Sequence, residues 1–148
     1  MIDRSLIGRS WPAFEVEIEK GRLRLLAKAI GETRPIYTDE GAARAAGYRS
    51  IVAPPTFAFC VLADAPGPTH YLADVGIPVE EVLHGEQGFT FHAVMCAGDR
   101  VRVTRRVIDV YDRKGGALEF VVFESEVRFA GTEELAATGR QVMIWRHR

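Results

Sequence analysis

The second half of the chain alternates apolar and polar residues, and this alternation constrains the fold more than any other feature of the sequence. Over residues 88–145 the apolar side chains recur mostly at every second position, which is the period of a strand with one buried face. Short segments that contain glycine, at 113–116 and 130–132, interrupt the pattern and indicate turns. Sequential strands joined by short turns form an antiparallel sheet. The phase of the alternation shifts at 107–110, which predicts a β-bulge there.

The first half of the chain predicts a short strand followed by helices. Residues 14–18 alternate apolar and acidic side chains, as in a half-buried strand. Residues 23–30 repeat apolar side chains at helical spacing and end before a glycine. Residues 39–46 start at an aspartate that can cap a helix and stop at another glycine. The segment 56–63 is almost uncharged and predicts a helix that is buried on most sides.

The two halves together predict an α+β fold in one domain that spans residues 1–148. A sheet with one apolar face needs cover, and the 56–63 helix is the segment apolar enough to provide it. An antiparallel sheet wrapped around one apolar central helix is the hot-dog architecture. Its exposed edges favour pairing between two such sheets, so we expect a dimer.

The composition of the chain indicates which binding partners and which cellular compartment to expect. The net charge is −1, from 19 basic and 20 acidic residues, so the sequence predicts no nucleic-acid-binding surface. No apolar run approaches the roughly 20 residues that cross a bilayer, and the first residues lack the continuous apolar stretch of a signal peptide. Cys60 and Cys96 match no metal or redox spacing. We therefore expect a cytoplasmic protein with reduced thiols, no metal site and no membrane span.

The stretch from Ala29 to Phe59, together with two later segments, resembles the MaoC-like dehydratase family of hot-dog proteins. The resemblance is to its FAS1-like branch, which includes the N-terminal halves of double-hot-dog dehydratases and stand-alone subunits. It rests on short motifs whose order and spacing cover nearly the whole chain: Gly47-Tyr48, Ala53-Pro54-Pro55-Thr56-Phe57, Leu83-His84-Gly85-Glu86-Gln87 and Ala97-Gly98-Asp99.

The resemblance implies an activity on acyl thioesters. Active relatives hydrate trans-2-enoyl thioesters or dehydrate (R)-3-hydroxyacyl thioesters, with coenzyme A or an acyl-carrier protein as the substrate handle and no other cofactor. An Asp and a His in their motif Gly-Asp-x-Asn-Pro-x-His activate a water molecule. A backbone amide at the start of the buried helix polarises the thioester carbonyl. In this chain the resemblance implies that the acyl group is bound by residues at and just after the start of that helix, which are Pro55, Thr56, Phe57 and Phe59.

This chain departs from the motif at the positions that carry the proton chemistry. Its matching stretch, 31–37, reads Gly-Glu-Thr-Arg-Pro-Ile-Tyr, so Glu32 replaces the Asp and Tyr37 replaces the His. The pKa of a tyrosine is ordinarily about 10, against about 6.5 for a histidine, which makes Tyr37 a poor base at neutral pH. Glu32 displaces its acid group by about an ångström, and such a displacement can cost about a hundredfold in rate. Pro55 has no amide hydrogen to offer to a carbonyl.

Other side chains offer alternative roles. His84 and Glu86 either form an acid–base pair or hydrogen-bond a loop to the sheet or to a partner chain. Arg102, Arg105 and Arg106 either meet the phosphates of coenzyme A or belong to a solvated strand face. The remaining histidines are expected at the surface or the terminus: His70, His92 and His147.

Three functional hypotheses remain open at this point. The first is a non-catalytic or weakly catalytic subunit that shapes the acyl-binding tunnel, in a heterodimer with a hot-dog partner that carries the intact Asp/His dyad. The second is an active hydratase or dehydratase that uses Glu32 or His84, for which a homodimer would suffice. The third is an acyl-CoA thioesterase or an acyl-ligand-binding protein, because hot-dog folds host several thioester activities.

Overall fold

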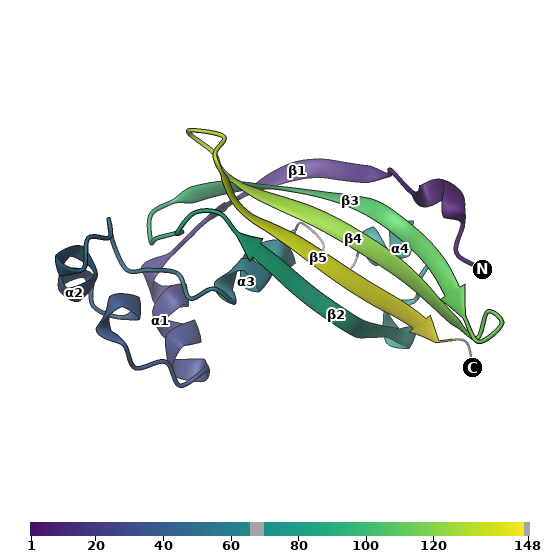
Figure 1. The fold of residues 1–148 in the computed structure, drawn as a ribbon, viewed down its shortest axis with the longest axis horizontal. Helices are drawn as coiled ribbons and strands as arrows, with labels where there is room; N and C mark the ends of the chain where they lie inside the picture. The colour runs from purple at the N-terminus through teal and green to yellow at the C-terminus, as the bar shows by residue number, and fades with distance from the viewer. Residues whose placement is uncertain (66–69, 147–148) are drawn as a thin grey trace.

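A computed structural model describes residues 1–65 and 70–146, and its largest element is a five-stranded antiparallel sheet in the order β1-β3-β4-β5-β2 (Figure 1). The strands are β1 (Ser10–Glu17), β2 (Val82–Phe91), β3 (Arg100–Arg113), β4 (Leu118–Phe129) and β5 (Leu135–Arg146). The α-helices are α1 (Lys20–Ala29), α2 (Glu40–Ala45), α3 (Phe57–Ala63) and α4 (His70–Asp74). Three short 3₁₀ helices complete the described elements: η1 (Arg4–Leu6), η2 (Pro35–Tyr37) and η3 (Val79–Glu81).

The predicted strands, turns and bulge of the second half are confirmed. Strands β3 and β4 form a long hairpin, and its turn takes left-handed backbone angles at Lys114, Gly115 and Gly116, with φ of 55°, 63° and 89°. Glycine adopts such angles without steric cost, so the Gly-Gly pair accounts for the tight turn. The register of β3 against β4 shifts between Val107 and Asp109, where the sequence pattern changes phase.

Strand β2 starts earlier in the chain than the sequence predicts. The sequence places its start near Gly88, with the preceding motif in a loop, whereas the strand begins at Val82 and includes His84 and Glu86. The register shifts between these two residues, so a bulge at Gly85 breaks the alternation that would have identified a strand. A Cβ atom on Gly85 would lie 2.7 Å from Ile144 Cδ1 on β5, which explains the glycine.

The predicted helices of the first half are also confirmed. Helix α1 buries Leu23 and Ala27 and is followed by Gly31, whose φ is +71°. At α2 the Asp39 side chain accepts a hydrogen bond of 2.6 Å from the Ala42 amide, as an N-terminal cap should. The sequence did not predict α4.

Helix α3 packs against the face of the sheet that we call the inner face; the opposite face is the outer face. Its buried side chains share one core with inner-face residues of β3, β4 and β5. The helix members are Phe57, Ala58, Val61 and Leu62, and the strand members are Val101, Val103, Val127, Ala136 and Ala137. A second core, which includes Tyr71 and Leu72 of α4 and Phe123 of β4, covers the other end of the inner face. The expected arrangement of a sheet around an apolar helix is therefore present (Figure 1).

Truncation of α3 at its buried face should reveal how much the core depends on it. Phe57 is 1 % exposed, so Phe57→Ala is expected to lower the free energy of unfolding by about 3 to 5 kcal/mol, through lost burial and the cavity left behind. Phe59, on the same helix, is 39 % exposed, and Phe59→Ala is the matched control with a smaller loss. Urea unfolding followed by tryptophan fluorescence measures both. Equal losses for the two variants would contradict the packing described.

Candidate functional site

The segment 31–37 lies between α1 and α2 and is anchored to the strand-like residues that precede α3. The amide of Val52 donates a 3.0 Å hydrogen bond to the Ile36 carbonyl, which brings η2 beside the start of α3. Tyr37 is buried there and lines an apolar hollow of about 230 Å³. The hollow also includes Pro55 and Phe91, so it is bounded by η2, the α3 start and the end of β2. This is where the resemblance places a catalytic water.

Glu32 is held in an ion pair with Arg34. The Arg34 guanidinium donates to both carboxylate oxygens, with Nη2 2.6 Å from Oε2 and Nε 3.0 Å from Oε1. The Arg34 backbone amide adds a third bond, 2.9 Å long. These hydrogen bonds lower the pKa of Glu32 to about 2. The same guanidinium lies 4.9 Å from the centre of the Tyr37 ring, so one arginine contacts the residues at both dyad positions.

The start of α3 offers little to a thioester carbonyl. The amides of Phe57 and Ala58 are already bonded to the carbonyls of Pro54 and Pro55, at 2.8 and 3.2 Å. Pro55 itself has no amide hydrogen. The remaining amide is that of Thr56, which is exposed. Thr56 is thus the residue at this turn whose amide is left available to a carbonyl.

His84 and Glu86 do not form an acid–base pair. The His84 ring stacks on Phe59 at 5.6 Å between ring centres and borders an inner-face cavity. Glu86 pairs with Arg140 at 3.0 Å on the outer face, where its side chain is largely exposed. The bulge between the two residues turns their side chains to opposite faces of the sheet. The structural role considered for Glu86 fits this position, because it ties β2 to β5.

The four expected acyl-binding residues lie in different surroundings. Pro55 lines the apolar hollow beside Tyr37, and Thr56 is exposed. Phe57 is part of the core under α3, with the Arg22 guanidinium 5.4 Å from the centre of its ring. Phe59 faces the His84 cavity at the other end of the helix. The helix thus separates two hollows, and the predicted residues are divided between them.

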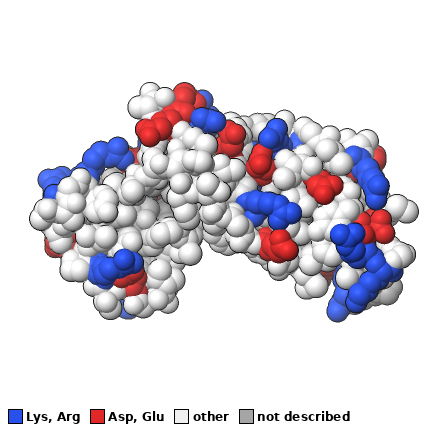
Figure 2. Space-filling model, viewed as in Figure 1, with Lys and Arg blue, Asp and Glu red and all other residues white. Residues whose placement is uncertain are grey.

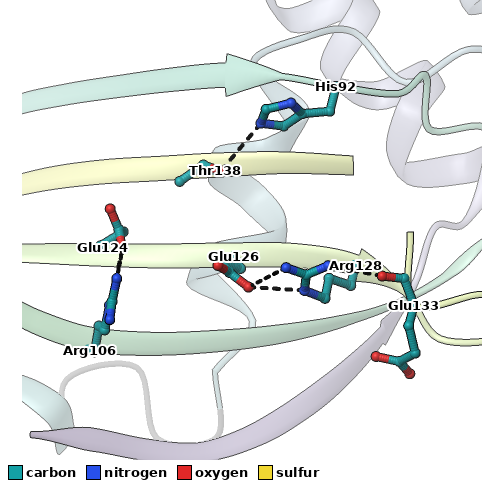
Figure 3. A network of polar contacts seen from close by, with 7 residues as sticks. All are labelled: His92, Arg106, Glu124, Glu126, Arg128, Glu133 and Thr138. Carbon is teal, nitrogen blue, oxygen red and sulfur yellow. Dashed lines mark hydrogen bonds and ion pairs between the residues drawn. The ribbon is translucent and has the colours of Figure 1, made fainter. Parts of the chain in front are cut away.

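The three arginines of β3 divide between the two faces. Arg106 pairs with Glu124 at 2.5 Å, and Arg102 pairs with Glu133 at 2.8 Å, both on the outer face. Figure 3 shows the Arg106–Glu124 pair beside the Glu126–Arg128 pair. Figure 2 shows acidic and basic side chains mixed over much of the sheet, with basic side chains gathered at its lower right end in this view. Arg105 is buried on the inner face, a position that its phase with Val103 and Val107 could have indicated.

The histidines outside the motif add no site. The His92 Nε2 atom lies 3.5 Å from the Thr138 hydroxyl, in an exposed contact (Figure 3). The side chain of His70 and the whole of His147 lie outside the described residues. Within residues 1–65 and 70–146 no group of three or more His, Cys, Asp and Glu side chains is arranged to hold a metal ion. No helix of that part of the chain is long and apolar enough to cross a membrane.

The ion pair at Glu32 makes a direct prediction. Its carboxyl pKa, measured by NMR titration, is expected near 2, and Arg34→Met is expected to return it toward 4.5. Because the pKa is lower in the folded chain, the stabilisation is present above pH 4.5 and disappears as the pH falls toward 2. Arg44→Met removes a comparable exposed arginine, paired with Glu40, and should leave Glu32 unchanged. A Glu32 pKa near 4.5 in the unaltered protein would show that the pair does not persist in solution.

Comparison with known proteins identifies the family. Residues 5–137 match the FAS1-like, dehydratase domain region. A UPF0336 protein of Streptomyces avermitilis is 36 % identical over 115 residues, which cover 77 % of each chain. The C-terminally truncated HadBC (3R-hydroxyacyl-ACP dehydratase) complex of Mycobacterium tuberculosis shares the fold at a TM-score of 0.77 and 23 % identity, over 94 % of this chain and 96 % of that one. A MaoC-like dehydratase superposes with a TM-score of 0.82 at 19 % identity, over 96 % of this chain and 42 % of that one. The chain belongs to the FAS1-like dehydratase family and has the hot-dog fold of the MaoC-like dehydratases.

Proposed function

We propose that this chain is a non-catalytic or weakly catalytic subunit of an (R)-specific enoyl-thioester hydratase or 3-hydroxyacyl-thioester dehydratase. It shapes the acyl-binding tunnel beside a hot-dog partner that carries the intact Asp/His dyad. The observation that carries the proposal is the Arg34 guanidinium, which pairs with Glu32 and lies over Tyr37 where an active site needs a free carboxylate and an imidazole.

The proton chemistry supports this assignment. Addition of water to an enoyl thioester needs a base whose pKa lies near the working pH. A carboxylate with a pKa of about 2 has little affinity for a proton at neutral pH, so Glu32 is a weak candidate. Tyr37 is no better, because a phenol ordinarily holds its proton until about pH 10. His84 is titratable, but Glu86 lies on the opposite face and cannot orient it.

The edge of the sheet supports a partner chain. Strand β2 is an edge strand, and such strands offer unpaired backbone groups to a second chain. Leu83 and Phe91 on this strand are 49 % and 48 % exposed, an apolar surface that water disfavours. The structurally similar HadBC protein is named as a complex, which supports a partner chain here. The apolar hollow at Tyr37 borders the same strand through Phe91, so a partner on this edge would close it.

The scaffold is suited to an acyl group on coenzyme A or an acyl-carrier protein. The hollow at Tyr37 is lined mainly by apolar side chains, as a hydrocarbon chain requires. No redox or metal cofactor enters the proposal. Both cysteines are free, in keeping with the reducing conditions of the cytoplasm.

Co-expression with a partner tests the assignment. The partner is a hot-dog protein with an intact Gly-Asp-x-Asn-Pro-x-His motif that is encoded next to this chain. We expect the two chains to co-purify, and we expect the complex to hydrate crotonyl-CoA at least about 10²-fold faster than this chain alone, since general acid–base catalysis contributes on that scale. Size-exclusion chromatography and the loss of enoyl absorbance measure the two results.

A variant separates this assignment from an active lone enzyme. Glu32→Gln in the complex should change the rate by less than about twofold, whereas a catalytic Glu32 would lose about a hundredfold. His84→Ala in the lone chain tests the other candidate base. Brisk hydration by the lone chain would overturn the proposal, and release of free thiol from acyl-CoA would favour a thioesterase instead.

A further inference from the structure

The inner face carries a polar cavity at the C-terminal end of α3, remote from the Tyr37 hollow. Its volume is about 210 Å³. Phe59, Leu62 and Met143 form apolar walls, while Arg105 of β3 and Gln141 of β5 are the buried polar residues among those that line it. We call it the Arg105 cavity. Arg105 is 6 % exposed and Gln141 is 8 % exposed, so both residues are largely buried.

Within the part of the chain that the structure describes, the partners of the Arg105 guanidinium are neutral. Its Nη2 donates 3.0 Å to the Leu62 carbonyl at the end of α3, and its Nε lies 3.5 Å from the Ser125 hydroxyl. The guanidinium carbon is 4.0 Å from the centre of the Tyr71 ring. Among residues 1–65 and 70–146 no carboxylate forms an ion pair with Arg105. Guanidinium N–H groups remain beyond those used in these two contacts.

A buried guanidinium without a carboxylate partner is costly, and its bond to the Leu62 carbonyl places Arg105 at the C-terminal end of α3, where a positive charge is favoured. Burial lowers the pKa of Arg105, because desolvation disfavours the charged form. Val103 and Val107 fill the inner-face positions on either side of it in β3 with apolar side chains. A buried charge is often replaceable by a well-packed apolar residue without loss of stability. The guanidinium N–H groups that Leu62 and Ser125 leave unused can therefore bind a ligand that brings the opposite sign.

The remaining chemistry of the cavity defines that ligand. A planar guanidinium matches a carboxylate, which it can bind through two parallel hydrogen bonds. The Gln141 amide lies in the same cavity and forms no hydrogen bond with the other described residues, so it can bind a carboxylate oxygen as well. The apolar walls suit a few methylene groups. The volume is below the roughly 300 Å³ of a drug-sized pocket, which limits the ligand to a short chain.

We propose that the Arg105 cavity binds a carboxylate at the end of a short aliphatic chain. Under the proposed function, on which this reading rests, the carboxylate is the far end of an acyl group whose thioester lies in the active site. The substrate class is then an acyl thioester that carries a terminal carboxylate, and a small free dicarboxylic acid is the other source of the same chemistry.

Calorimetry on the purified chain tests the cavity. Adipoyl-CoA and heptanoyl-CoA are nearly the same length and differ in their chain ends, a carboxylate against a methyl group. Coenzyme A is common to both, so its contribution cancels. We expect adipoyl-CoA to bind at least about tenfold more tightly, as a charge-assisted hydrogen bond allows. Free adipate, titrated separately, reports whether a dicarboxylic acid binds without the thioester.

Arginine variants test whether Arg105 causes the preference for adipoyl-CoA over heptanoyl-CoA. Arg105→Met should abolish the preference for adipoyl-CoA, whereas Arg106→Met, which removes the adjacent outer-face arginine, should preserve it. Because Arg105 also bonds the end of α3, Arg105→Met could unfold, and Gln141→Leu then serves as the second variant, with an expected loss of several-fold. Circular dichroism establishes which variants fold.

The outcomes separate this inference from the proposed function. Equal affinities for the two thioesters, together with no binding of adipate, overturn the cavity assignment whether or not a partner chain co-purifies. A preference that survives in folded Arg105→Met overturns it as well. Adipate binding that depends on Arg105, in a chain that forms no complex with a dyad-bearing partner, supports the cavity and assigns the ligand as a free acid.

Discussion

Burial of the apolar helix α3 against the inner face of the sheet is the interaction on which the rest of the structure depends. Phe57, Ala58 and Val61 are buried, and valine and alanine side chains of the strands belong to the same core. Burial of such side chains is the dominant favourable term in folding. The same packing positions a hollow at each end of the helix.

The two ends differ in chemistry because the helix ends differ. At the N-terminal end, Pro54 and Pro55 occupy the chain where amides would otherwise be free, and the hollow there is apolar. At the C-terminal end the last carbonyls lack partners within the helix, and Arg105 reaches the Leu62 carbonyl from the sheet. One hollow is therefore lined mainly by apolar side chains, and the other contains a guanidinium.

Arg34 changes the chemistry available to segment 31–37, which resembles the catalytic motif. A single guanidinium binds Glu32 and covers Tyr37, so the loop is held by an ion pair rather than by contacts to a water molecule and substrate. The family scaffold persists, while a glutamate and a tyrosine stand at the dyad positions. Under the proposed function, division of labour between two hot-dog chains accounts for both observations.

Much of the fold followed from local patterns in the sequence. The alternation over 88–145, the bulge near Val107 and the Asp39 cap depend on neighbours in the chain, and such short-range signals can be read directly. The start of β2 could not be read, because the bulge at Gly85 interrupts the alternation and only pairing with β5 reveals the strand. The strand order, with β1 beside β3 and β2 at the edge, likewise depends on contacts between distant segments.

For the candidate site the sequence alone determined the loss of the imidazole and of the Pro55 amide, since residue identity decides both. Only the tertiary structure decided that Glu32 forms an ion pair with Arg34. It also decided that the side chains of His84 and Glu86 lie on opposite faces of the sheet. Likewise, it decided that Arg105 is buried while Arg106 is exposed. The reason is physical: a residue's chemistry is fixed by its covalent structure, but its proton affinity and its partners depend on what the folded chain places around it.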